Sequence, residues 1–205
     1  MSSYRYGLKM LARACAVGFL SVLGACGTFY VDNNLHDLAP SERAAVANPK
    51  PVQLLFDFQT KGASNSRARD QLTAPVTQAV QDSAVFSAVS AAPAPSGAIL
   101  QVTINNVPLT DDAFARGFAV GFTFGLVGTT VGDGYVCTAE YVGGTDAAKI
   151  TKVERDAIYT SLGATASTPQ HATKVKSLDE AVHLMVHKCV GNVLNDLARD
   201  PAFAK

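Results

Sequence analysis

The chain has 205 residues, of which 17 are basic and 17 acidic, so its formal net charge is zero. With 48% hydrophobic residues it has the composition of a folded protein and not of a disordered one. Because no basic cluster stands out, the chain lacks the electrostatic footprint of nucleic-acid binding, and we expect no DNA or RNA partner.

Residues 1–25 have the three parts of a secretory signal peptide. The cations Arg5, Lys9 and Arg13 come first, without an acidic residue among them, and the apolar run 15–23 follows. Small residues then precede a cysteine. The apolar run is shorter than the roughly 20 residues that a transmembrane helix needs. We therefore interpret residues 1–25 as a segment that is removed from the mature protein.

The residues Leu23-Gly24-Ala25-Cys26 resemble the lipobox of bacterial lipoproteins, in particular those of the proteobacterial outer membrane. The resemblance implies that Cys26 receives diacylglycerol, becomes the first mature residue and is acylated on its new amino group, as palmitate-bearing lipoproteins are. Three acyl chains exceed the two signals that stable anchoring requires. Gly27 is not the Asp that signals inner-membrane retention, which favours the periplasmic face of the outer membrane. The alternatives are an ordinary cleaved secretory signal without a lipid and an uncleaved membrane anchor.

The mature chain would keep 180 residues, enough for one domain with its own core. Removal of the signal takes away three basic residues and no acidic residue, so the mature chain has a net charge of −3. Residues 26–50 show no sustained apolar period and no strand alternation. We interpret them as the lipidated N-terminus and a tether that holds the domain off the membrane. The periplasmic domain is expected over residues 51–205.

The first elements of this domain alternate between strand and helix patterns. Residues 52–59 alternate apolar and polar side chains and predict a strand with one buried face. Residues 67–86 predict a helix that starts or kinks near Pro75. A short extended piece at 86–90 and a second strand over 99–107 follow.

The second half of the domain begins with a predicted hairpin. Residues 135–142 and 153–162 read as strands, and the turn-forming residues 143–146 lie between them. Residues 164–176 read as a polar loop.

The last element is the clearest helix. Ser177 and Glu180 match a capping box at its start, and the helix ends near Arg199. Its apolar stripe consists of Val182, Met185, Val186, Cys189, Val193 and Leu197. Two helices on an antiparallel or mixed sheet of about four or five strands define a single small α+β domain.

Cys137 and Cys189 are the cysteines that follow Cys26. Cys137 lies in a predicted strand and Cys189 on the apolar face of the last helix, and these two elements are expected to pack together. In an oxidising compartment an even pair favours a disulfide, which we predict. The alternative is two separate buried thiols.

The uncharged segment 117–128 has glycine at every fourth position. On a helix the glycines form one row and larger apolar residues the next; the two rows are Gly117, Gly121, Gly125 and Phe118, Phe122, Leu126. We expect this Gly-rich apolar segment to be buried against the sheet. Two alternatives are an apolar patch for self-association or a protein partner, and a segment that contacts the membrane.

The sequence carries no motif typical of an enzyme: it has no GxSxG, no P-loop and no strand-preceded GxGxxG. His183 and His187 lie on one helix face with Glu180, but the spacing lacks the glutamate of HExxH, and zinc needs three or four ligands. We interpret this face as a solvated helix surface. No catalytic residue, metal ion or cofactor is predicted.

The sequence therefore predicts a non-enzymatic outer-membrane lipoprotein with a binding, accessory or structural role in the periplasm. Its expected partners are the membrane, through Cys26, and an envelope protein or a second copy of the chain. The alternative is a carrier or binder of a lipid or another apolar ligand.

Overall fold

The computed structural model describes residues 27–109, 130–144, 147–162 and 168–203. The predicted signal peptide, Cys26 and the apolar segment 117–128 lie outside the described residues, so their roles stay predictions. In the described part of the chain, no helix combines the length and the apolar character needed to cross a bilayer.

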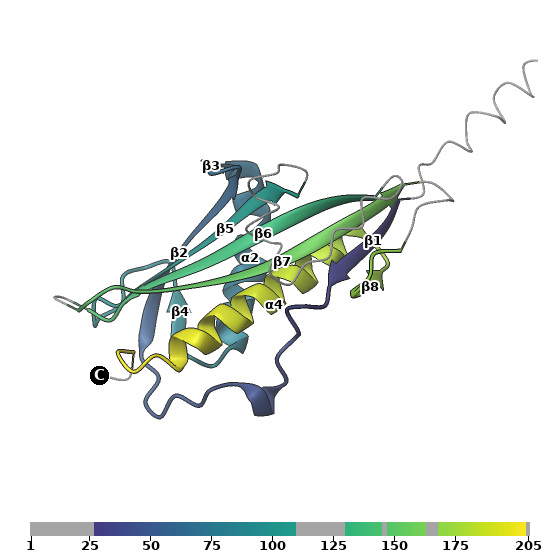
Figure 1. Cartoon of the computed structure of the whole chain (residues 1–205). Coiled ribbons are helices and arrows are strands. Elements are labelled where there is room, and N and C mark those ends of the chain that lie inside the picture. The colour runs from purple at the N-terminus through teal and green to yellow at the C-terminus, as the bar shows by residue number, and fades with distance from the viewer. Residues whose placement is uncertain (1–26, 110–129, 145–146, 163–167, 204–205) are drawn as a thin grey trace, which may run out of the picture.

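Within these residues eight strands form one mixed sheet on which two long helices pack (Figure 1). The strands are β1 (Gly27–Asp32), β2 (Pro51–Thr60), β3 (Ala63–Ser64), β4 (Ala88–Ser90), β5 (Ile99–Pro108), β6 (Thr130–Val142), β7 (Ile150–Leu162) and β8 (Ala172–Val175). The helices are α2 (Ser66–Asp82) and α4 (Leu178–Ala198), and a 3-10 turn, η1, spans Pro40–Glu42.

The order of the strands is β3-β2-β5-β6-β7-β1-β8, with β4 paired to β2. β2 runs parallel to β4 and β5, whereas β6 is antiparallel to both β5 and β7. The predicted α+β class with two helices on a mixed sheet is thus confirmed. The sheet is larger than the four or five strands predicted, because short strands at 27–32, 63–64 and 172–175 extend it.

The main core lies between the sheet and its two helices. In β5, the alternate residues Leu100, Val102 and Ile104 face the helices and have no exposed surface. The predicted apolar stripe of α4 faces them, with the buried members Met185, Val186, Cys189, Val193 and Leu197. Burial of these side chains is the main favourable term in the folding of such a domain.

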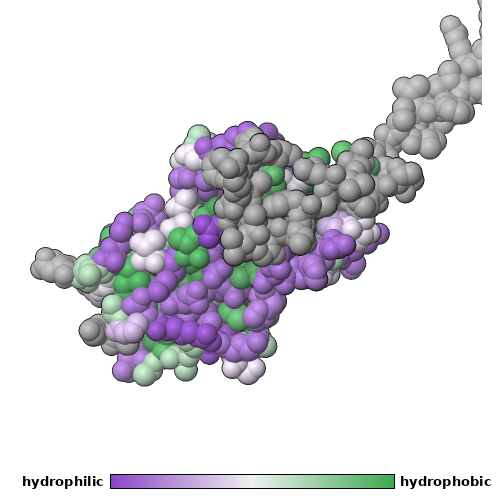
Figure 2. Space-filling model, in the orientation of Figure 1, coloured by the Kyte–Doolittle hydropathy of each residue, from purple (hydrophilic) through white to green (hydrophobic). Residues whose placement is uncertain are grey.

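A smaller apolar cluster lies on the opposite face of the sheet. It contains Tyr30, Val107, Leu109, Ala157 and Tyr159, of which Tyr30 and Tyr159 are direct partners across β1 and β7. On the face shown in Figure 2, hydrophilic residues dominate the described surface, and apolar residues lie between them in small groups.

The start of α4 carries the predicted cap. The Ser177 hydroxyl accepts a hydrogen bond from the Glu180 backbone N–H at 3.1 Å. The Glu180 carboxylate accepts from the backbone N–H of Lys176 at 2.7 Å, one residue earlier than the capping box predicts. The first contact satisfies a backbone N–H that a helix start leaves unpaired, and the second pairs the N–H of the residue before the cap.

Helix α2 ends earlier than predicted. Asn65 caps its start, its side chain accepting from the Ala68 backbone N–H at 3.1 Å, and the helix runs through Pro75. It stops at Asp82 and not at residue 86, because Ala84 has a φ of 56°, which a right-handed helix does not allow. The apolar residues that suggested a longer helix belong to the connection to β4.

The predicted tether at residues 26–50 is wrong for the part that is described. β1 lies between β7 and β8 in the sheet, so that Gly27 pairs with Leu162 and Val31 with both Ile158 and Thr173. This strand has only six residues, and apolar side chains pack on both of its faces. Its alternation is therefore too brief to stand out in a sequence.

Residues 33–50 belong to the domain as well, since they run along α4 and bond to it. Asn192 donates to the backbone carbonyl of His36 at 2.9 Å, and the backbone N–H of Ala44 donates to the Asn195 side chain at 2.7 Å. These bonds are made by irregular backbone, which leaves no periodic pattern in the sequence.

The hairpin is confirmed at its predicted place but is longer than predicted. β6 and β7 have 13 residues each and pair from Thr130 and Ser161 to Tyr141 and Ile150. The predicted polar loop 164–176 contains β8, which pairs with β1. β8 has four residues, too few to show a period.

Candidate functional site

The two cysteines predicted to pair form a disulfide. Cys137 comes from β6 and Cys189 from α4, and their Cα atoms are 6.1 Å apart. Both residues are fully buried in the main core. The disulfide therefore joins the last helix to the centre of the sheet. Because both cysteines are buried, a ligand cannot reach the bond.

The two histidines of α4 do not converge on a common site. Nε2 of His183 lies 3.8 Å from a carboxylate oxygen of Asp179, whereas Nδ1 of His187 lies 2.9 Å from one of Asp37. Glu180 is engaged in the helix cap. Among the residues that the structure describes, no three His, Cys, Asp or Glu side chains are grouped so that they could hold a metal ion.

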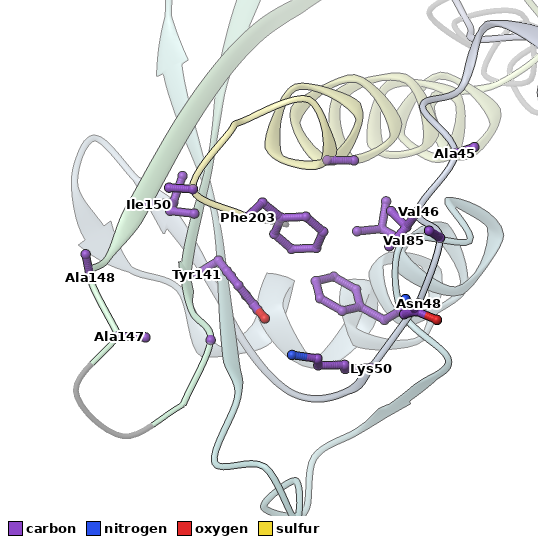
Figure 3. A pocket seen from close by; sticks show the side chains of 15 residues that line it. Ala45, Val46, Asn48, Lys50, Val85, Tyr141, Ala147, Ala148, Ile150 and Phe203 are labelled. Atoms are coloured by element: carbon purple, nitrogen blue, oxygen red, sulfur yellow. The ribbon is translucent and has the colours of Figure 1, made fainter. Parts of the chain in front are cut away.

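A cavity of about 700 Å³ lies at the end of the domain where α4 stops and the β6–β7 hairpin turns. Its lining comes from the segment before β2, the end of α2, the hairpin turn and the residues after α4 (Figure 3). The described lining residues are mainly apolar; they include Val46, Val85, Phe86, Tyr141, Ile150 and Phe203.

Three aromatic rings form one wall of this cavity. Phe86 follows α2, Tyr141 lies near the end of β6 and Phe203 lies in the turn after α4. The ring centroids are 5.7 Å apart for Phe86 and Tyr141, 4.9 Å for Tyr141 and Phe203 and 6.0 Å for Phe86 and Phe203. These separations are in the range in which aromatic pairs attract each other, so the rings stabilise one another in place.

A few polar groups reach the same cavity. In Figure 3 the Tyr141 hydroxyl points toward the side of the cavity where Lys50 lies, and Asn48 lies beside it. Burial raises the pKa of the Tyr141 hydroxyl, which therefore remains a neutral donor at physiological pH. Of the described lining residues, Lys50 is the one with a charge.

The carboxylate of Asp200, which lies close to Phe203 in the sequence, is not part of the cavity lining. Asp200 accepts from Lys152 at 2.8 Å and from the backbone N–H of Ala202 at 2.8 Å. The first of these contacts is the larger reason why the pKa of Asp200 is lowered. The positive charge of Lys50 is thus the charge that a molecule in the cavity would meet.

No sequence pattern pointed to this cavity. Its residues come from parts of the chain that only the fold brings together. Their neighbours in the sequence form no recognisable motif: Lys50 lies between two prolines, and Phe203 lies in a short turn. The apolar segment that we had singled out, 117–128, lies outside the described residues.

A buried ion pair lies deeper in the domain. Nζ of Lys188 on α4 is 3.0 Å from Oδ2 of Asp156 on β7, and it donates to Oδ1 at 3.3 Å. It also donates to the backbone carbonyl of Asp32 at the end of β1. The Asp32 carboxylate accepts from the Tyr159 hydroxyl at 3.2 Å.

The electrostatics of this cluster are governed by burial. Burial raises the pKa of Asp156 to about 7, although the nearby Lys188 acts in the opposite direction. It also raises the pKa values of Asp32 and of the Tyr159 hydroxyl. Because Asp156 and Lys188 are almost fully enclosed, a substrate has no route to them. We interpret the cluster as part of the core and not as a reactive site.

An open groove of about 570 Å³ lies between α2 and the start of α4. Its described apolar lining consists of Phe58, Ala68, Leu72, Tyr135, Leu178 and Val182. Leu178 is 49% exposed, which is high for a leucine beside a core. The groove is a second surface at which apolar groups of another molecule would fit.

Comparison with known proteins finds only distant structural likenesses. No family model and no curated protein matches the chain. Among solved structures, the PelC dodecamer from Paraburkholderia phytofirmans matches 87% of this chain and 99% of its own, with 13% identity and a TM-score of 0.35. A PelC variant from the same organism gives 14% identity and the same TM-score over 85% of this chain and 99% of its own.

Protein XCC0632 from Xanthomonas campestris matches 75% of this chain and 84% of its own, with 15% identity and a TM-score of 0.27. At these identities and scores the likeness supports no statement about function. The chain is thus an α+β domain whose cavity is lined in part by three aromatic rings.

Proposed function

We propose that this chain is a lipid-anchored, non-enzymatic binding protein of the bacterial envelope. The residues Leu23-Gly24-Ala25-Cys26 support the anchor and its address at the periplasmic face of the outer membrane. The cavity at the end of α4 supports the binding role, and it is the observation that carries the proposal.

The cavity has the properties of a small-molecule site. Its volume of about 700 Å³ lies within the range of roughly 300–1,000 Å³ that ligand pockets occupy, and such pockets are lined by apolar and aromatic groups with a few polar ones. The wall formed by Phe86, Tyr141 and Phe203 suits a flat or flexible apolar body. Lys50 and the Tyr141 hydroxyl suit an anionic or hydrogen-bond-accepting group at its end.

The proposed ligand is therefore a mainly apolar molecule with one anionic group. The test uses 8-anilinonaphthalene-1-sulfonate, which has both features and fluoresces when it leaves water. We expect Ala202→Trp, which fills the cavity from its rim, to abolish the bound fluorescence. The matched control is Ala63→Trp on β3, whose alanine is also exposed but lies outside the cavity lining.

The role of Lys50 is tested separately. Lys50→Met keeps the length of the side chain and removes its charge, and we expect affinity for the sulfonate probe to fall roughly tenfold, as the loss of one charge-assisted hydrogen bond implies. Lys174→Met, at an exposed lysine on β8, is the matched control.

Unchanged probe binding in Ala202→Trp would show that the probe binds elsewhere and would remove the main support for the proposal.

A second candidate role, binding of an envelope protein, is favoured by the groove between α2 and α4. A photo-crosslinking residue at Leu178 in intact cells would then capture one defined protein. The same residue at Leu55 on β2, 42% exposed and remote from the groove, is the control. Equal capture at both positions would count against the groove as a docking site.

A further inference from the structure

We propose that the end of the sheet that begins at Gly27 lies directly on the membrane, with the uncharged, partly apolar ends of β1, β6 and β7 against the lipid. The proposal rests on the proposed anchor at Cys26. It concerns how the domain is placed, and it commits to the bilayer surface as what this end of the sheet contacts.

No residue lies between the proposed anchor at Cys26 and the first residue of the sheet. Gly27 is already paired with Leu162, and Cys26 is the residue before it. One residue of extended chain spans at most about 3.6 Å. A diacylglycerol group on Cys26 therefore brings the ends of β1 and β7 to the level of the lipid headgroups.

The second step is the composition of this end of the sheet. The ends of β1, β6 and β7 meet there, at residues 27–29, 130–132 and 159–162, and these three ranges contain no charged side chain. β8 also ends there, at Val175 opposite Phe29, and the exposed Lys176 follows it. A mixture of threonine, tyrosine and aliphatic residues suits the interface between headgroups and acyl chains, where an ionised side chain would be costly.

The third step is the exposure of large apolar side chains at this end. Val131 is 46% and Leu162 42% exposed. Across the strands Val131 lies opposite Thr160, which in turn lies opposite Phe29, so the three form one row beside Leu162. Ile158, two residues before this row on β7, is 1% exposed, so the exposed apolar surface begins only beyond it.

The position of the cavity follows from this placement. Leu162 and Ile150 are the two ends of β7, a strand of 13 residues, and Ile150 lines the cavity. Figure 1 shows β7 running along the length of the sheet. At about 3.3 Å per residue its two ends are roughly 40 Å apart. An acyl chain spans only about half of the 30 Å hydrocarbon core. The lipid on Cys26 therefore cannot fill the cavity, which stays open to a ligand from the periplasm.

The chain contains no tryptophan, so one introduced tryptophan reports on its own surroundings. Leu162→Trp and Leu55→Trp are a matched pair, because both leucines are 42% exposed and only the first lies at the Gly27 end. The lipidated full chain is reconstituted in vesicles of phosphatidylethanolamine and phosphatidylglycerol whose acyl chains are brominated near the headgroup. We expect quenched, blue-shifted emission from the tryptophan at position 162 and unchanged emission from the one at position 55.

Val131→Trp gives an independent reading at the same end and is expected to behave as Leu162→Trp does. Thermal unfolding of each variant shows whether the fold is retained. Mass measurement of the same preparations shows whether Cys26 is lipidated.

A lipidated protein with unquenched tryptophans at both 131 and 162 would overturn this inference and leave the anchor intact. Equal quenching at positions 55 and 162 would also overturn it, because the sheet would then lie flat. An unlipidated Cys26 would overturn the proposed anchor and this inference together.

Discussion

The ammonium group of Lys188 lies 3.0 Å from a carboxylate oxygen of Asp156, at positions where the two side chains are 5% and 0% exposed. The same ammonium donates to the backbone carbonyl of Asp32, so one side chain of α4 contacts both β7 and β1. Charges in such surroundings are tolerated only when they are paired and hydrogen-bonded. The pair therefore makes the position of α4 on the sheet sensitive to the loss of either partner.

We expect Lys188→Met to lower the free energy of unfolding by roughly 3 kcal/mol at neutral pH, as the loss of one partner of a buried pair implies. The loss should be larger at pH 8.5 than at pH 6, because at pH 6 the unpaired Asp156 carboxyl can take up a proton. Urea denaturation at the two pH values measures both effects. Lys174→Met, at an exposed lysine, is the control. A loss that is the same at both pH values would contradict the proposed coupling.

Asp156 also predicts how stability depends on pH. Burial raises its pKa in the folded protein from 3.8 to about 7. Between these values the folded protein holds a proton that the unfolded chain has released. The contribution of Asp156 to the free energy of unfolding is therefore full below about pH 4 and is lost as the pH rises through about 7, by up to about 4 kcal/mol.

We expect Asp156→Asn to flatten the pH dependence of stability between pH 4 and 7, since Asn cannot titrate. Burial likewise raises the pKa values of Asp32 and Glu154, so the parent and the variant should both retain some slope. Denaturant unfolding at half-unit pH steps checks this. A variant with the slope of the parent would show that Asp156 titrates normally in the folded protein.

The disulfide should contribute strongly to stability. Cys137 and Cys189 are 52 residues apart in the sequence, and a loop of that length predicts a stabilisation of about 4 kcal/mol. We expect the double variant Cys137→Ala/Cys189→Ala to unfold at lower temperature and lower denaturant concentration. A reductant should destabilise the parent and leave the double variant unchanged. An equal response of both proteins would mean that the bond does not hold the fold.

The cap of α4 gives a smaller, local prediction. Ser177→Ala removes the acceptor for the Glu180 backbone N–H and should lower the free energy of unfolding by about 1 kcal/mol. Ser177→Asp keeps an acceptor and should restore most of it. Ser87→Ala, at an exposed serine between α2 and β4, is the control and should change little. Equal stability of the Ala and Asp variants at position 177 would contradict the capping role.

Much of the sheet and the last helix could be predicted because their patterns are long. The alternation over 52–59 and 99–107, and the 21 residues of α4 with a cap at Ser177, repeat often enough to be recognised. The disulfide followed from placing Cys137 in a strand and Cys189 on the apolar face of a helix expected to pack against it. In each case a local pattern agreed with the global fold.

β1, β8 and the cavity could not be predicted, for different physical reasons. β1 and β8 have six and four residues, and pairing with distant strands, not their own pattern, makes them strands. The cavity joins Lys50, Tyr141 and Phe203, which share no local pattern and meet only because α4 ends beside the hairpin turn. Lys188 gave no signal of its own, since a lysine on a helix normally faces water.

The place of β1 in the sheet also bears on how the domain is made. Its residue Val31 pairs with Ile158 on β7 and Thr173 on β8. β1 precedes both strands in the chain, so it cannot pair with them until they have been synthesised. A chain that crosses a membrane from its N-terminus would present β1 as an unpaired edge until residue 173 has emerged, and unpaired edges invite association with other chains. Closure of this end of the sheet thus depends on contacts between distant parts of the chain, which makes it a slow step of folding.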